Sequence, residues 1–372
     1  MTRAFVVDDS PICRAQLREW LEADGDLEVV GEAADGESAI YLITRLRPDV
    51  ATIDLRLPGM SGLEVVTQLM AKSPLPLLVV TGAPACDYAD LAFEAIRRGA
   101  LDLQLKPSGT DDDAIRSLRA KVRWLASVPV VRHIDGNRAP SEPSGRHAES
   151  GRHAESGRPA DVLRPPDTAI RAPRVARTSN DPVVVGIAAS AGGPSALATV
   201  LGALSVDLPV CLAIVQHLPR GFAPSFVSFL QSRCSLAVRL AEPGLVPPPG
   251  TVVLAPDDHH LELIDGRFEL TSGPPVDGHR PSGTVLLRSL ASLGGAAIGV
   301  VLSGIGRDGA DGLRAMRDRH AVTFAQDANS SVVYGMPRAA VEDGAVQQVL
   351  PVAALGDAIS AAVACSRRWR RP

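Results

Sequence analysis

Hydrophobic residues in the first 126 positions form short runs that alternate with longer segments of helical periodicity. Short apolar runs between turn residues are typical of buried strands, and apolar residues three or four apart indicate helices. The predicted strands are Ala4–Val7, Leu27–Gly31, Val50–Ile53, Leu77–Val80 and Leu101–Leu105. The predicted helices are Pro11–Ala23, Gly36–Arg47, Gly62–Lys72, Tyr88–Gly99 and Asp111–Ala126. This alternation predicts a doubly wound parallel sheet with its ligands at the carboxyl ends of the strands.

The same alternation returns at about residue 182. Buried strands are predicted at Val183–Val185, Val210–Val215, Val252–Leu254, Ala297–Leu302 and Val322–Phe324, and a helix at Ser195–Leu201. We therefore expect an α/β protein with two doubly wound parallel-sheet domains, at residues 1–126 and 182–372. No basic helix-turn-helix pattern is visible in the second domain, which argues against a DNA-binding output.

Between these domains, at about residues 127–181, large apolar residues become scarce and Pro, Arg and Gly become frequent. The hexapeptide Ser144–Glu149 is repeated at Ser150–Glu155 and begins again at Ser156. Such a segment buries too little apolar surface to fold. We predict a disordered linker.

Composition narrows the class of protein further. The net charge of −4 over 372 residues does not indicate nucleic-acid binding, and 45% hydrophobic residues suffice for two cores. The five cysteines are scattered, which favours reduced thiols over disulfides or a zinc site. Asp8 and Asp9 interrupt the first apolar run, so no signal peptide is expected, and the other apolar runs are too short to span a bilayer. We expect a soluble cytoplasmic protein.

A glycine-rich turn at Gly186–Pro194 joins a predicted strand to a helix and carries Ser190. A serine held on such a turn can act as a nucleophile, and nearby backbone N–H groups can stabilise an oxyanion. A phosphate-binding turn is the alternative. However, the dinucleotide pattern fails at Ala188 and Ala191, and no P-loop lysine follows. The turn therefore favours a nucleophile over a plain connection.

A serine nucleophile needs a base and a group that orients the base. His217 ends a predicted strand, and Asp308 lies in a glycine-rich loop after another. Both can converge on Ser190, although the chain order Ser–His–Asp is not that of α/β-hydrolases. Spacing alone leaves competing candidates at Asp257, Asp258, His259, His260 and His279.

Five polar residues follow strands of the first predicted sheet: Asp8, Asp9, Asp54, Thr81 and Lys106. Three carboxylates at one sheet edge repel each other unless a cation joins them, and such oxygen ligands suit Mg²⁺. Solvated acids would explain each residue singly but not the five at strand ends together.

The first domain resembles the receiver domain of two-component response regulators. The resemblance rests on Asp8-Asp9, on the stretch Asp54–Gly62, on Thr81 and on Lys106-Pro107. It implies that Asp54 accepts a phosphoryl group and that Asp9 and Asp54 bind Mg²⁺ directly, with Asp8 acting through water. It also implies that Thr81 and Lys106 contact the phosphoryl oxygens.

The second domain resembles the catalytic domain of the chemotaxis protein-glutamate methylesterase family. The matching stretches are Ser190–Pro194, Gln216–Pro219, Ala255–His260, His279–Ser282, Ser303–Ala310, Ala325–Asp327 and Tyr334–Pro337. The resemblance implies that Ser190 is the nucleophile, His217 the general base and acid, and Asp308 the orienter of the imidazole. The backbone amides of Ala191 and Ile305 are the expected oxyanion donors.

The chain departs from these family patterns at several positions. Ala191 replaces a common threonine, and Ile305 replaces a common methionine. Gly283-Thr284 stands where Val-Asp is usual, which puts the role of that loop in doubt. Leu103 occupies the position of a switch aromatic in many receivers.

Together the resemblances imply a phosphorylation-activated methylesterase. It would hydrolyse glutamate γ-methyl esters on chemoreceptors, release methanol, and deamidate certain receptor glutamines. They also imply a histidine kinase as phosphodonor, Mg²⁺ in the first domain, no cofactor in the second, no nucleic-acid partner, and a location at receptor arrays without membrane insertion. Two alternatives stay open: a receiver-regulated module that sequesters a partner without turnover, and an esterase for a protein outside chemotaxis.

Overall fold

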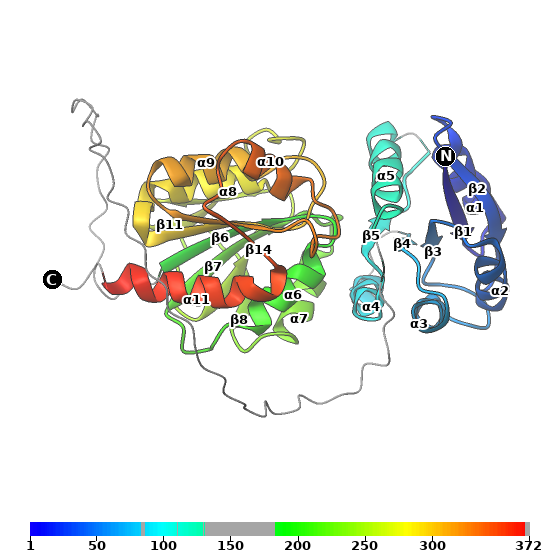
Figure 1. Cartoon of the computed structure of the whole chain (residues 1–372), viewed down its shortest axis with the longest axis horizontal. Coiled ribbons are helices and arrows are strands. Elements are labelled where there is room, and N and C mark those ends of the chain that lie inside the picture. The colour runs from blue at the N-terminus through cyan, green and yellow to red at the C-terminus, as the bar shows by residue number, and fades with distance from the viewer. Residues whose placement is uncertain (83–85, 110, 129, 131–182, 369–372) are drawn as a thin grey trace, which may run out of the picture.

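The computed structural model describes residues 1–82, 86–109, 111–128, 130 and 183–368 (Figure 1). Most of the predicted linker, including the repeats from Ser144 to Glu155, lies outside these residues. None of the described helices has the length and apolarity needed to cross a bilayer. The four cysteines whose side chains are described, Cys13, Cys211, Cys234 and Cys365, are free thiols.

The first domain is a five-stranded sheet in the order β2-β1-β3-β4-β5, and every strand pair in it is parallel. The strands are β1 (Thr2–Val7), β2 (Leu27–Ala33), β3 (Val50–Ile53), β4 (Leu77–Thr81) and β5 (Asp102–Leu105). The helices are α1 (Pro11–Glu22), α2 (Gly36–Leu46), α3 (Gly62–Lys72), α4 (Cys86–Arg97) and α5 (Asp112–Leu125). Strand order reverses between β1 and β3, so a crevice is expected where these two strands end.

The helix starts of this domain follow capping rules that can be read in the sequence. Ser61 caps α3 in a capping box, since its hydroxyl accepts from the Glu64 amide and Glu64 accepts from the Ser61 amide. Asp35 caps α2 by accepting from the Ser38 amide. These caps fix where α2 and α3 begin, and α3 starts at the predicted residue.

The second domain contains a seven-stranded parallel sheet in the order β14-β13-β12-β6-β7-β9-β8. Its strands are β6 (Val183–Ala189), β7 (Val210–Gln216), β8 (Ala237–Leu240), β9 (Thr251–Leu254), β12 (Ala297–Val301), β13 (Val322–Gln326) and β14 (Gln348–Leu350). An antiparallel hairpin of β10 (His260–Ile264) and β11 (Arg267–Thr271) stands apart from this sheet. The chain winds outward in both directions from β6 and β12, which places a second crevice at their carboxyl ends.

Helices cover both faces of this sheet (Figure 1). They are α6 (Gly193–Gly202), α7 (Ala223–Gln231), α8 (Gly283–Leu290), α9 (Ala310–Asp318), α10 (Met336–Glu342) and α11 (Val352–Arg368), with a 3-10 turn η1 (Ala291–Ala296). Separate clusters of fully buried apolar side chains lie on the two faces; one includes Leu197 and Phe226, and the other includes Leu286 and Leu313. The predicted fold class, two parallel-sheet α/β domains, is confirmed.

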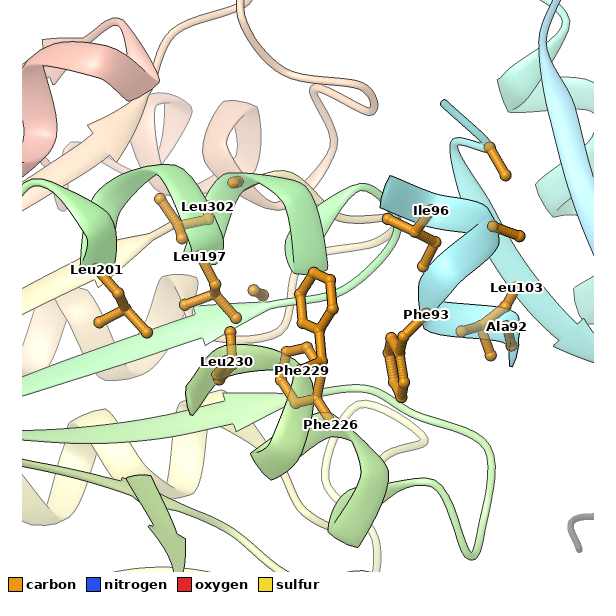
Figure 2. Packing of buried hydrophobic residues seen from close by; sticks show 14 of the residues in the cluster. Ala92, Phe93, Ile96, Leu103, Leu197, Leu201, Phe226, Phe229, Leu230 and Leu302 are labelled. Carbon is orange, nitrogen blue, oxygen red and sulfur yellow. The ribbon is translucent and has the colours of Figure 1, made fainter. Parts of the chain in front are cut away.

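The two domains share an apolar contact between α4 and α7 (Figure 2). Phe93 of α4 lies with its ring centroid 5.3 Å from that of Phe229 and 5.2 Å from that of Phe226. Phe222 meets the same ring edge-on at 6.2 Å. Phe93 is only 2% exposed, and three aromatic rings of the second domain contact it.

Candidate functional site

Ser190 lies on a sharp turn between β6 and α6, as the sequence predicts. Its amide donates to the Ser303 carbonyl at 3.0 Å, and its own carbonyl accepts from the Gly193 amide at 2.8 Å. Gly192 has φ of 74°, a left-handed conformation that favours glycine, and Pro194 occupies the first helical turn. The turn therefore holds the serine at the carboxyl edge of the sheet, in front of a helix N-terminus.

Glycine at position 304 lets the loop after β12 pack directly against this turn. A Cβ at Gly304 would lie 2.1 Å from the Met336 sulfur and 2.8 Å from Cβ of Ser190. Ser303 strengthens the contact, because its hydroxyl donates to the Ala191 carbonyl at 2.7 Å. The serine turn and this loop thus form one packed unit.

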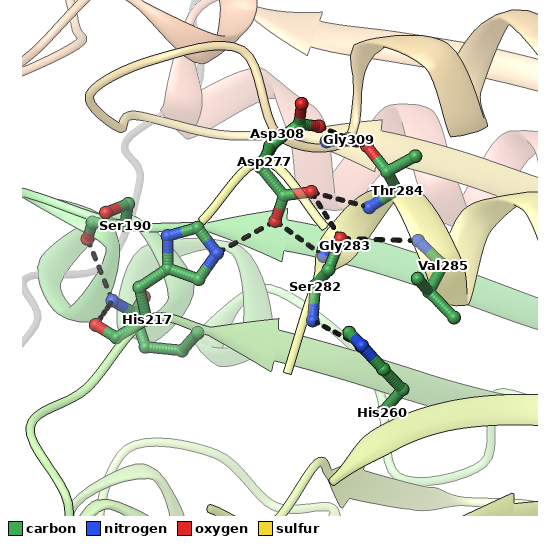
Figure 3. Close-up of polar contacts among 11 residues, drawn as sticks. Ser190, His217, His260, Asp277, Ser282, Gly283, Thr284, Val285, Asp308 and Gly309 are labelled. Atoms are coloured by element: carbon green, nitrogen blue, oxygen red, sulfur yellow. Dashed lines mark hydrogen bonds and ion pairs between the residues drawn. The ribbon is translucent and has the colours of Figure 1, made fainter. Parts of the chain in front are cut away.

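His217 follows β7, and its ring lies between Ser190 and the carboxylate of Asp308 (Figure 3). Its Nε2 is 2.8 Å from Oδ2 of Asp308, and the side chain is 10% exposed. Its Nδ1 is buried and has no hydrogen-bond partner among the described residues. The structure therefore brings the three predicted residues Ser190, His217 and Asp308 together, with one imidazole nitrogen held and the other unpartnered.

Asp308 is 1% exposed and is surrounded by donors. Oδ1 accepts from the Ser282 hydroxyl at 2.6 Å and from the Thr284 amide at 2.8 Å. Oδ2 accepts from the Gly283 amide at 2.6 Å as well as from His217. Burial opposes ionisation, but the hydrogen bond and charge of His217, together with the α8 N-terminus, outweigh it and hold the pKa of Asp308 well below its usual range.

The Gly283-Thr284 departure from the family pattern lies at the centre of this arrangement. A Cβ at Gly283 would lie 2.4 Å from that of Ala188, so glycine allows the close approach of α8 to β6. The Thr284 hydroxyl accepts from the Gly309 amide at 2.7 Å and lies 3.4 Å from Oδ2 of Asp277. The loop before α8 thus holds both Asp308 and the residue after it, a role that the sequence left in doubt.

Thr284→Val is expected to lower the free energy of unfolding by about 1–3 kcal/mol, because it leaves the buried N–H of Gly309 without a partner. Urea unfolding followed by circular dichroism measures this. Thr284→Ser, which keeps the hydroxyl, is the matched control and should cost less. Equal stability of the Val variant and the wild type would show that this hydrogen bond contributes nothing.

Gln216 is a positioning residue that sequence reasoning missed. Its side-chain amide donates to the carbonyls of Ser190, at 2.8 Å, and of His217, at 3.0 Å. It thereby fixes the ends of β6 and β7 relative to each other. The motif Gln216–Pro219 was noted in the sequence, but a side chain bridging two backbone carbonyls leaves no local pattern to recognise.

The competing histidines and acids have other partners. His260 is 2% exposed, accepts from the Ser282 amide through Nδ1 and contacts the Pro274 carbonyl through Nε2. The rest of its loop is bonded elsewhere: Asp257 accepts from the Gly221 amide, Asp258 pairs with Arg220, and Nδ1 of His259 contacts the Asp257 carbonyl. Of the five competitors, His279 alone has a contact with His217, a ring stack.

The two expected oxyanion donors belong to separate segments that meet at Ser190. Ala191 follows it on the turn, and Ile305 follows Gly304, which packs on it. Neither amide N–H donates a hydrogen bond within the described part of the chain. Both are therefore available to a ligand oxygen.

The predicted acidic cluster of the first domain forms where β1 and β3 end. Asp8, Asp9 and Asp54 each offer a carboxylate oxygen, and these oxygens lie within 4.8 Å of one another. Lys106 Nζ lies 2.5 Å from Asp54 Oδ2 and 2.7 Å from Asp8 Oδ2. Three carboxylates at this spacing fit a hard cation such as Mg²⁺.

The electrostatics of this cluster reflect burial and pairing. Burial raises the pKa of Asp8, although the hydrogen bond and charge of Lys106 act against it. Burial acts to lower the pKa of Lys106, but its bonds to Asp54 and Asp8 raise it. Thr81 is fully buried, its carbonyl accepts from the Lys106 amide at 2.7 Å, and its hydroxyl has no partner among the described residues. The Asp54 carboxylate therefore lies beside the Lys106 ammonium group.

Comparison with known proteins identifies the families of the two domains. Residues 4–117 match the response regulator receiver domain, and residues 185–359 match the CheB methylesterase. A protein-glutamate methylesterase/protein-glutamine glutaminase 2 of Anaeromyxobacter dehalogenans is 40% identical over 353 residues, 94% of each chain. A protein-glutamate methylesterase/protein-glutamine glutaminase of Nitrosospira multiformis is 36% identical over 370 residues, 98% of each chain.

Among solved structures, the CheB methylesterase catalytic domain of Thermotoga maritima is 32% identical to this chain, with a TM-score of 0.47. The match covers 48% of this chain and 98% of that one. The relatives named above match over nearly the full length, through both domains and in the same order. This chain belongs to the CheB methylesterase family, with a receiver domain ahead of the methylesterase domain.

Proposed function

We propose that the protein hydrolyses γ-methyl esters of glutamate on chemoreceptors, releasing methanol, and deamidates receptor glutamines. The observation that carries the proposal is the state of His217. One ring nitrogen is bonded to Asp308, an ionised carboxylate that accepts from several donors. The other nitrogen is buried, faces Ser190 and has no hydrogen-bond partner among the residues that the structure describes. A histidine held in this way is a base ready to accept a proton.

In the acylation step, Nδ1 of His217 accepts the proton of the Ser190 hydroxyl as Oγ attacks the ester carbonyl. The Asp308 carboxylate keeps the Nε2 proton in place and stabilises the imidazolium that forms. The amides of Ala191 and Ile305 supply donors for the oxyanion. His217 then returns the proton to the departing methoxide, and methanol leaves.

In the second step, His217 takes a proton from water, which attacks the acyl-enzyme carbonyl. The bond from that carbonyl to Ser190 Oγ then breaks, His217 returns the proton to Oγ, and the glutamate carboxylate is freed. The same steps on a glutamine side chain release ammonia in place of methanol. Both reactions need one nucleophile, one base and one oxyanion site, which are the groups gathered at the carboxyl edge of the second sheet.

Methanol release from methylated receptor membranes tests the proposal. The purified full-length protein should release methanol in proportion to enzyme added, with many turnovers per molecule. Binding to the membranes without release would favour the alternative, a module that sequesters its partner. Release from a methylated protein outside chemotaxis, with none from receptors, would keep the esterase and change the substrate.

Control by phosphorylation is the second part of the proposal. Asp54 is the proposed phosphoryl acceptor; Asp8, Asp9 and Asp54 would hold Mg²⁺, which neutralises charge on the phosphoryl group when bound. Lys106, which pairs with Asp54, and Thr81, whose hydroxyl has no partner among the described residues, would contact the phosphoryl oxygens. A histidine kinase is the proposed donor.

The contact between the domains suggests how phosphorylation reaches the esterase site. Ser195 and Val332 of the second domain line a cavity of about 420 Å³ together with Ile96 and Leu101 of the first. Val332 also packs on the serine turn, since a Cβ at Gly192 would lie 2.4 Å from its Cβ. The receiver therefore reaches the rim of the Ser190 site, and docking there would restrict access by a receptor helix.

Phe93→Ala is expected to raise the esterase rate of the unphosphorylated protein. An aromatic anchor at the centre of an interface contributes about 2 kcal/mol, so its loss shifts the docking equilibrium by roughly 30-fold. The rate should rise several-fold, up to that limit. Methanol release without phosphodonor measures it.

The control for this variant is Tyr41→Ala, which removes an exposed aromatic ring from α2, on the side of the receiver away from the second domain (Figure 1). Phosphoryl uptake by the Phe93 variant shows that its receiver is folded. If neither Phe93→Ala nor removal of the receiver raises the basal rate, the receiver does not inhibit by covering the site, and phosphorylation must act by positive contact or by delivery to the receptor.

A further inference from the structure

His279 lies flat against the proposed base. The ring centroids of His279 and His217 are 3.6 Å apart, and the ring planes differ by 14°. The ring of His279 makes no hydrogen bond to any described residue, so stacking is its contact with the site. Ser190 and Asp308 define the two ends of the His217 ring, and His279 covers one of its faces.

A rigid turn presents His279 to His217. Val276 and His279 exchange both backbone hydrogen bonds, at 3.0 and 2.9 Å, across Asp277 and Gly278. The two central residues have φ of 52° and 80°, the conformation of a type I′ turn, which Asp-Gly favours. Asp277 also lies within reach of the Thr284 hydroxyl.

This turn closes a ring of contacts around the base. Asp277 contacts Thr284, the Thr284 amide donates to Asp308, Asp308 binds His217, and His217 stacks on His279. The ring of His217 is thus held at Nε2 by Asp308 and on one face by His279, and these contacts are linked through Thr284 and Asp277. Such support is what keeps a catalytic group within a productive geometry.

The stacked ring is uncharged at neutral pH. Burial, and then the proximity of His217, lower the pKa of His279 to about 4, while Asp308 acts in the opposite direction. Asp277 on the same turn is a further acid near it, at the exposed end of the turn. A neutral aromatic face beside an imidazolium is attractive, whereas a second positive charge would be repulsive.

We propose that His279 is a positioning residue for the esterase reaction: stacked and uncharged, it orients the His217 ring and favours the imidazolium formed when Ser190 gives up its proton. It does not itself transfer a proton. The inference rests on the proposed Ser–His–Asp function. His279 is thus a fourth side chain of the site that acts through His217. The reaction steps themselves are carried out by Ser190, His217 and Asp308.

Three variants of the full-length protein, assayed by methanol release, test it. His279→Ala should lower kcat by about 10–100-fold with KM nearly unchanged, because the base loses its orientation while the substrate groove is kept. His279→Phe should restore most of the rate, since it stacks but cannot titrate. His279→Lys should move the acid limb of the kcat/KM pH profile to lower pH by about one unit or more, because a positive charge opposes protonation of His217.

His320→Asn serves as the control, since His320 is exposed and precedes β13 at the opposite edge of the sheet from Ser190. Thermal unfolding of each variant separates misfolding from a catalytic effect. A wild-type rate in His279→Ala, no rescue by His279→Phe, or an unmoved acid limb in His279→Lys would each overturn the inference. No methanol release by the wild type, or full release by Ser190→Ala, would instead overturn the proposed function.

Discussion

Ser190→Ala is expected to lower methanol release by roughly 10⁴-fold or more while leaving the fold intact. The variant removes one hydroxyl from a turn held by backbone bonds: the Ser190 amide donates to Ser303, and its carbonyl accepts from Gly193 and from Gln216. None of these contacts uses the side chain. Stability should therefore change little while the attacking atom is lost.

His217→Ala should have nearly the same effect, and the double variant should add little. The serine oxygen is a weak nucleophile until the base takes its proton, so neither residue supports the esterase reaction without the other. Near-identical rates for the two single variants and the double variant would support action as a unit. Additive losses would point to separate roles.

The control for the serine change is Ser292→Ala, which removes an exposed hydroxyl bonded to the Ser289 carbonyl, away from the site. It should leave methanol release at the wild-type level. Far-ultraviolet circular dichroism and thermal unfolding check that Ser190→Ala is folded. A near wild-type rate for folded Ser190→Ala would mean that another group is the nucleophile.

The sequence predicted the sheets well because their strands are buried on both faces. Val50–Ile53 and Gly62–Lys72 were placed at their observed bounds, and other predicted strands and helices differ by a few residues at the ends. Central parallel strands appear as continuous apolar runs with polar residues where they end. Because the carboxyl ends of such strands share one edge, the same pattern predicted that Asp8, Asp9 and Asp54 gather and that His217 and Asp308 can converge on Ser190. The choice of His217 and Asp308 over the competing residues rested on the family resemblance.

Short and partly exposed strands were not predicted. β8, β11 and β14 are not fully buried; β14 spans three residues and carries a Gln and an exposed Val. Their apolar runs are too brief to separate from loops. β10 was missed for another reason. Its first residue, His260, follows Asp257, Asp258 and His259, and these side chains were interpreted as a loop of candidate catalytic groups and not as the start of a strand.

The contacts that position the catalytic side chains could not be predicted from the sequence either. The Thr284 amide on Asp308, the Gln216 amide on two carbonyls and the stack of His279 on His217 join residues from separate segments. A backbone N–H donor cannot be recognised in a sequence because every residue except proline has one. A ring stack cannot be recognised either, because it depends on the conformation of the loop that carries the ring.

At the other site, Asp54→Asn is expected to abolish phosphoryl uptake from a small phosphodonor. The variant removes the carboxylate that would attack phosphorus and one of three oxygen ligands in the cluster. It also replaces the charged partner of Lys106 with a neutral amide. Chelation of Mg²⁺ should have the same effect on the wild type, because the clustered acids then repel the incoming phosphoryl group without compensation.

Asp35→Asn is the matched control, because Asp35 caps α2 from the surface and Asn caps a helix about as well. It should take up phosphoryl label as the wild type does. In the esterase assay, phosphodonor should stimulate the wild type and Asp35→Asn but leave Asp54→Asn at its basal rate, because the Ser190 site is untouched. Phosphoryl label retained by Asp54→Asn would mean that another residue is the acceptor. Stimulation of methanol release by phosphodonor in a protein that takes up no label would mean that activation does not require phosphorylation of the receiver.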